Sequence, residues 1–249
     1  MTDVNMANRQ CCDLDIREFA SNKPFMFADF CNTTTAGFTG DSVYAMKKGS
    51  KAIAFPNPID STITIEFQCH PFKVYSLLSD GTISSEAVLP VRKEVKCTTA
   101  GTLTIPDVVA VENTVYVYNS GDFGGEEIKG TATNTTGVSF TATTDTDVEV
   151  DSTYLVCFLE KKTTGVQRVE FNNKKNIRDY RITMETLDKD ANGLYYPARI
   201  TAYKVTPKRQ FEAKFASDGE PATITMTFDA LEDNEGNILD MVEITDTTL

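Results

Sequence analysis

The sequence RITAYKVTPKRQFEAKFASDGEPATITMTFDAL, residues Arg199–Leu231, decides the fold of this chain. Apolar and polar residues alternate strictly in its second half. The apolar side carries Phe211, Ala213, Phe215, Ile224, Met226, Phe228 and Ala230. The polar side carries Gln210, Glu212, Lys214, Thr223, Thr225, Thr227 and Asp229. A period of two is typical of half-buried antiparallel strands, so we predict three successive strands with a turn at Asp218–Pro221 before the last.

The same alternation occurs earlier in the chain, in Ser61–Cys69, after the turn signal Asn57–Asp60. The segment Pro71–Gly81 follows; it begins with Pro, ends with Gly and has apolar residues at positions 72, 75 and 78. This pattern predicts a short amphipathic α-helix. The fold class is therefore mainly β, an antiparallel β-sandwich or barrel with a short flanking α-helix.

A change in composition marks the middle of the chain. Between Val95 and Lys162, Thr, Val, Gly and Asp dominate, and short strands are expected near 101–105, 114–118, 137–143 and 153–159. Short strands separated by Gly, Asn and Asp turns indicate a small β-sandwich-like module. We predict that residues 93–164 are this module, inserted into a β domain made of residues 41–92 and 165–249.

Residues 1–40 form an N-terminal arm without a clean period. Within it, Ile16–Ala20 suggests a short helical turn and Thr33–Gly40 a loop. The arm is too apolar for a disordered segment. We expect an extended arm that docks on its own domain or on a neighbouring copy.

The charge and the cysteines narrow the function classes. The net charge of -12, with no Lys or Arg after Lys214, argues against a chain that grips nucleic acid. No N-terminal apolar run fits a signal peptide, and no segment approaches the roughly 20 apolar residues of a membrane span. We therefore expect a protein of the cytosol, or of a particle assembled there. The six cysteines show no paired metal spacing, so we expect free thiols that mostly fill core positions.

Two local motifs suggest chemistry and are better explained by structure. Asp188–Gly193 matches the first half of a calcium loop, but the twelfth position is Arg199, a cation where the pattern needs Glu. A hairpin turn uses the same residues. His70, the one histidine, adjoins Cys69, but neighbouring residues of a strand point to opposite faces. We expect no catalytic residue, metal or cofactor; a pair of carboxylates, as in glycosidases, is the remaining enzyme hypothesis.

The most basic region of the chain lies before the long alternating stretch. It contains Lys161 and Lys162, then Lys174, Lys175, Arg178 and Arg181. Such a region is commonly a solvated face. Because the C-terminal segment is acidic, a contact between copies of the chain is the alternative, since complementary patches on one chain favour head-to-tail association. We treat Lys174, Lys175, Arg178 and Arg181 as a candidate contact between subunits.

Residues Pro207–Asp240 resemble the C-terminal part of tail tube proteins of long-tailed bacteriophages. The resemblance is carried by Phe211–Phe215, Ser217–Thr223, Met226–Leu231 and Asp233–Asn237. Ile53–Phe55, Ile63–Phe67 and Pro71–Tyr75 are similar to the N-terminal half of the same fold. About half of the chain is covered, and the motifs are structural. The 93–164 module departs from the minimal tube protein.

The resemblance implies a virion protein that forms hexameric rings stacked into a hollow tube, assembled in the bacterial cytoplasm, with a fold related to type VI secretion tube proteins. It implies that genomic DNA and the tape-measure protein occupy the channel, and that sheath, terminator and baseplate proteins are partners. A weakly acidic, Thr-rich lining would let DNA slide. The candidate channel-lining residues are Thr64, Glu66, Gln68, Gln210, Glu212, Thr225 and Thr227. The alternative is a decoration or baseplate protein whose middle module binds a partner or a glycan.

Overall fold

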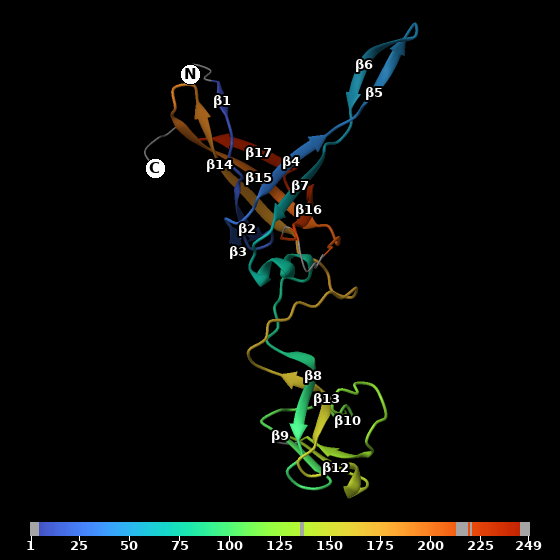
Figure 1. Ribbon diagram of the computed structural model, residues 1–249. Coiled ribbons are helices and arrows are strands. Elements are labelled where there is room, and N and C mark those ends of the chain that lie inside the picture. The colour runs from blue at the N-terminus through green and yellow to red at the C-terminus, as the bar shows by residue number, and fades with distance from the viewer. Residues whose placement is uncertain (1–4, 135–136, 213–218, 220, 245–249) are drawn as a thin grey trace. The chain divides into compact units, whose positions relative to one another are not determined.

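Nine antiparallel strands form the principal sheet of the computed structural model, which describes residues 5–134, 137–212, 219 and 221–244 (Figure 1). The order across the sheet is β3-β2-β14-β15-β16-β7-β4, with β1 paired to β14 and β17 paired to β15. The strands are β1 (Met6–Ala7), β2 (Asp13–Glu18), β3 (Pro24–Ala28), β4 (Thr33–Thr39), β7 (Asp60–Phe67), β14 (Tyr180–Asp190), β15 (Tyr195–Pro207), β16 (Ile224–Leu231) and β17 (Leu239–Glu243).

Alternation places one face of this sheet in a hydrophobic core. Met226 and Phe228 of β16 and Ile63 of β7 are fully buried, while the residues between them are not. The same core contains Leu14 and Ile16 from β2, so both halves of the sheet enclose it. The predicted mainly β, antiparallel fold is confirmed.

The stretch Arg199–Leu231 contains two strands in its described part. They are β15 and β16, which pair from Lys204–Leu231 to Pro207–Phe228. Gln210, Phe211 and Glu212, the described start of the predicted middle strand, have no regular secondary structure. The rest of that predicted strand, Ala213–Phe215, lies outside the described residues.

Two local expectations for the N-terminal arm are wrong. Residues 16–18, expected in a helical turn, belong to β2, because the alternation of Asp13–Glu18 lets Leu14 and Ile16 enter the core beside β14. Thr33–Thr39, expected as a loop, is strand β4 and pairs with β7 along its whole length. Its side chains are exposed or half-buried, so it lacks the apolar period that would have revealed it.

A short helix follows β7, as predicted, with 3-10 geometry: η1 (Phe72–Leu78). Its buried residues are Val74, Ser76, Leu77 and Leu78, so of the predicted row at 72, 75 and 78 only Leu78 is buried. Phe72 and Tyr75 lie on the outer side and pack edge to face, with ring centroids 5.6 Å apart. The helix thus closes the core with its Val74–Leu77 row.

Chain contacts divide the protein into two compact units, residues 1–82 with 170–249, and residues 83–169. The second unit contains two three-stranded sheets in its described part, β10-β13-β8 and β11-β12-β9. Their bounds are β8 (Ala87–Lys96), β9 (Thr102–Pro106), β10 (Tyr116–Asn119), β11 (Gly130–Thr133), β12 (Gly137–Ala142) and β13 (Thr153–Lys162), with the turn η2 (Asp145–Asp147). Val117, Val138, Val156 and Phe158 are buried between them. The two sheets thus share one buried cluster, and the module predicted at residues 93–164 falls within this unit.

A two-stranded hairpin continues beyond β4 and β7 (Figure 1). It consists of β5 (Ser42–Lys47) and β6 (Ser50–Pro56). Val43 pairs with Phe55 and Ala45 with Ile53, so these four side chains share one face. Val43, Ile53 and Phe55 are 57–60% exposed. The sequence reasoning did not single out this apolar face.

Candidate functional site

The polar face of β7 and β16 is the most extensive feature that the sequence singled out. Residues directly opposite each other in an antiparallel pair point to the same face. The register pairs Thr225 with Glu66, Thr227 with Thr64 and Asp229 with Thr62. Their side chains therefore form a continuous row opposite the buried face.

The seven predicted channel-lining residues lie together at this surface. Thr64 and Thr227 face each other with hydroxyl oxygens 3.5 Å apart. The amide of Gln68 donates to the Thr223 hydroxyl at 3.3 Å. A shallow hollow of about 370 Å³ is lined by Gln210, Glu212, Thr223, Thr225 and Thr227. Glu66 lies in the row through its pairing with Thr225.

Strand β4 extends the face, and the sequence reasoning missed it. Thr33 is opposite Glu66 and Thr35 is opposite Thr64. Both threonines are exposed. The signal was the run Thr33–Thr35, since β-branched Thr favours a strand with a wet face. We call the polar face of β4, β7 and β16, opposite the core, the threonine face. It includes Gln68, Gln210, Glu212 and Thr223.

The threonine face carries acids, of which Asp229 forms an ion pair among the described residues. Lys208 Nζ lies 2.9 Å from Asp229 Oδ1. Among the described residues, Glu66 and Glu212 form no ion pair. The face thus offers hydroxyl groups and free carboxylates to water.

On the same face of the sheet, polar side chains of β2, β14 and β15 form ion pairs and hydrogen bonds. Arg199 Nε lies 3.0 Å from Glu185 Oε1, and Arg17 donates to Asp15 Oδ2. The hydrogen bond and the charge of Asp15 raise the pKa of Arg17. The Tyr203 hydroxyl donates to Asp240 at 2.7 Å, and this bond raises the pKa of Tyr203. The polar side chains named here are paired within the chain, although Asp240 Oδ1 is buried without a hydrogen-bond partner.

The predicted basic patch is largely neutralised within the chain. Lys175 Nζ lies 3.1 Å from Asp80 and 3.5 Å from Glu170. Arg178 pairs with Glu18 at 2.9 Å. Arg181 stacks 4.8 Å over the Tyr203 ring, and Lys174 is exposed. A denser group of cations lies at the turn of the β5–β6 hairpin: Lys47, Lys48 and Lys51.

The motifs that suggested chemistry have structural roles. Asp190 Oδ1 accepts the backbone N–H groups of Asn192 at 2.9 Å and Leu194 at 2.8 Å, in the hairpin turn between β14 and β15. His70 Nε2 is 2.7 Å from the Tyr75 hydroxyl, and its ring packs 5.2 Å from Phe67. Within the described ranges, no three His, Cys, Asp or Glu side chains are grouped closely enough to hold a metal ion.

The six cysteines are free thiols, as predicted, but only Cys97 and Cys157 are buried. Cys69 is exposed, while Cys11, Cys12 and Cys31 are half-buried. Burial raises the pKa of Cys31 to about 12. In the part of the chain that the structure describes, no helix has the length and apolarity to cross a bilayer.

The fold is thus a mainly β, antiparallel one, in which a wide polar sheet face lies opposite a hydrophobic core. The family model of the YomU/Tube protein family matches residues 60–244. The chain belongs to this family, and its resemblance to phage tail tube proteins is confirmed. It is thus a tube protein of the virion tail, and this membership favours a structural role over an enzymatic one. No curated protein matches the chain.

Proposed function

We propose that copies of this chain form hexameric rings that stack into the tail tube, with the threonine face lining the channel. The observation that carries the proposal is the threonine face itself. A sheet with one face packed on a hydrophobic core and a wide hydroxyl-rich opposite face suits a wall between protein and water.

The chemistry of the face suits the passage of DNA. Hydroxyl groups keep bound water at the wall, and the carboxylates of Glu66 and Glu212 repel phosphates. A cationic wall would bind the DNA backbone by releasing counterions. The proposed lining therefore lets genomic DNA move without specific binding.

The β5–β6 hairpin supports self-association. An isolated two-stranded hairpin is marginally stable in water. Val43, Ile53 and Phe55 leave an apolar row uncovered in the single chain. Burial of this row by another copy would stabilise both the hairpin and the assembly. Tail sheath, tape-measure, terminator and baseplate proteins are further proposed partners of the assembled tube.

Two experiments test the proposal. Negative-stain microscopy of the purified protein should show tubes or six-fold rings with a central hole; monomers or trimers would contradict it. Virions carrying Glu66→Lys, Thr225→Lys and Thr227→Lys together should eject DNA more slowly. The matched control places three lysines at exposed Glu126, Thr131 and Thr141 of the 83–169 unit, which makes the same change in charge. Unchanged ejection through intact variant tubes would count against a repulsive lining.

A second candidate function, surface binding by residues 83–169, is favoured by an aromatic hollow in that unit. Tyr116, Tyr118 and Phe123 line a hollow of about 520 Å³, and Arg92 stacks 4.9 Å over the Phe123 ring. Aromatic ring faces are electron-rich and attract C–H groups, so such a surface suits the apolar face of a sugar ring.

Glycan-array binding by the full chain tests this second function. Tyr116→Ala and Phe123→Ala should abolish binding, and Val109→Ala, at another exposed apolar position of the unit, should not. Equal loss in all three variants would argue against an aromatic sugar platform.

A further inference from the structure

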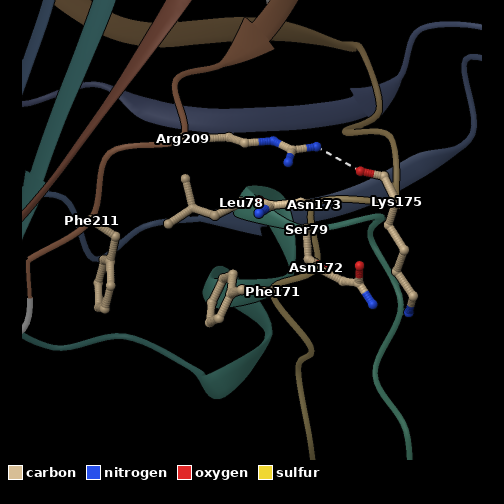
Figure 2. Close-up of a pocket in the computed structure, with 8 residues that line it drawn as sticks. All are labelled: Leu78, Ser79, Phe171, Asn172, Asn173, Lys175, Arg209 and Phe211. Atoms are coloured by element: carbon tan, nitrogen blue, oxygen red, sulfur yellow. Dashed lines mark hydrogen bonds between the residues drawn. The ribbon is translucent and has the colours of Figure 1, made fainter.

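A hollow of about 330 Å³ lies beside the C-terminal end of helix η1, within the unit of residues 1–82 and 170–249 (Figure 2). Its lining residues are Leu78, Ser79, Phe171, Asn172, Asn173, Lys175, Arg209 and Phe211. We call it the η1 socket. It takes no part in the threonine face.

The socket combines aromatic rings with a guanidinium group. Phe171 is 57% and Phe211 36% exposed, although Phe211 makes an edge-to-face contact with Tyr75, with ring centroids 5.4 Å apart. Figure 2 shows the Arg209 side chain lying along one side of the socket and reaching toward Lys175. Arg209 Nη2 donates to the Lys175 carbonyl at 2.6 Å. A guanidinium has five N–H donors, so most of those of Arg209 are left for an incoming carboxylate.

A complementary segment lies on strand β17. Met241 is the most exposed large hydrophobic residue among those described, at 75%. Glu243, also exposed, is two residues further along and therefore projects from the same face. β17 pairs with β15 on one side, and the described residues provide no strand on its other side. The segment thus presents an unbranched apolar side chain and a carboxylate at fixed spacing.

We propose that the η1 socket receives Met241 of a second copy of this chain, with Glu243 of that copy paired to Arg209. Thioether sulfur makes favourable contacts with aromatic rings, which the phenyl groups of Phe171 and Phe211 supply. The segment and the socket are different surfaces, so the contact is heterologous and can close a ring. This inference rests on the proposed assembly into rings and identifies a contact within it.

The charge of the socket favours β17 over the exposed apolar row of the β5–β6 hairpin. The β5–β6 hairpin ends in Lys47, Lys48 and Lys51, and these cations would be repelled by Arg209. The chain carries no cation after Lys214, so β17 has none to repel. Electrostatic complementarity therefore pairs the socket with β17.

A charge exchange tests the contact. Arg209→Glu and Glu243→Arg should each raise the protein concentration needed for ring formation at least tenfold, and the double variant should restore it. Lys93→Glu, at an exposed position of the 83–169 unit, makes the same change in net charge and should leave assembly unchanged. The double variant of Lys93→Glu and Glu243→Arg should still need the raised protein concentration to form rings. Far-ultraviolet circular dichroism and thermal unfolding show whether each variant folds.

A photo-crosslinker at position 241 locates the contact independently of charge. Crosslinks from assembled rings should map to peptides containing Phe171 or Phe211 of a different copy. Rings that form normally in both single variants, or crosslinks that map elsewhere, would overturn the socket and leave the tube proposal intact. Failure of the unmodified protein to form any ring would refute the tube proposal itself and, with it, the socket.

Discussion

The apolar row of the β5–β6 hairpin provides the sharpest test of self-assembly. Val43, Ile53 and Phe55 are 60%, 57% and 57% exposed in the single chain. Complete burial of such a side chain stabilises by about 1.5–3 kcal/mol, so covering the exposed part adds about 1 kcal/mol each. Replacing all three by Ser should therefore remove about 3 kcal/mol from a subunit contact, which corresponds to a roughly 100-fold weaker association.

The variant should remain as stable as the original chain when it is monomeric. Substitutions at exposed positions usually change the free energy of unfolding by about 0.5 kcal/mol or less. The assay pairs sedimentation velocity over a concentration series with urea unfolding of the monomer. Tyr44→Ser with Ala54→Ser changes the opposite face of the hairpin and is the matched control. Assembly of the triple variant at the original concentration would show that this row makes no subunit contact.

Three further predictions concern stability and assembly. Asp80, whose side chain is a quarter exposed, has its pKa lowered from 3.8 to about 2, first by a hydrogen bond from Thr82 and then by Lys175. The ionised form is thus favoured by folding, so this stabilisation, about 1 kcal/mol after screening, is present above pH 4 and lost as the pH falls toward 2. In urea unfolding, Asp80→Asn should have a lower free energy of unfolding than the original chain at pH 7 and the same one at pH 2. An equal loss at both pH values would show that the ionisation of Asp80 does not stabilise the fold. Asp190→Ala removes an acceptor of two backbone N–H groups and should lower the free energy of unfolding by about 2–3 kcal/mol, with Asp190→Asn losing less. Assembly should weaken as salt is raised, since charged contacts between exposed groups are screened, and salt-indifferent assembly would contradict a charged interface.

Sequence periodicity predicted the sheet wherever one face is buried. Ile63, Ile65 and Phe67 in β7, and Ile224, Met226 and Phe228 in β16, are buried as predicted. Met226→Ala, which leaves a cavity, should destabilise by about 2–5 kcal/mol, far more than Thr225→Ala on the wet face. Strand β4 could not be predicted in this way, because both of its faces are partly exposed and its threonines carry no apolar period.

Of the two candidate sites, sequence periodicity predicted the threonine face and did not predict the η1 socket. Alternation alone placed Thr64, Glu66, Thr225 and Thr227 opposite the core. It could not show that Arg209, Phe171 and Leu78 line one socket, because these residues come from three separate segments of the chain. Nor could it show that Lys175 and Arg178 are paired with acids distant in sequence.

By itself, the sequence determined the antiparallel class of the fold, the buried face of each long strand and the resemblance to tail tube proteins. These features depend on the alternation of apolar and polar residues and on short motifs, both of which are determined by residues adjacent in the sequence. Only the tertiary structure decided which strands pair, which cations remain free and where the apolar row of the β5–β6 hairpin and the η1 socket lie. Strand pairing brings together residues more than a hundred positions apart, as Thr64 and Thr227 do, and side-chain period carries no information about partners at that distance.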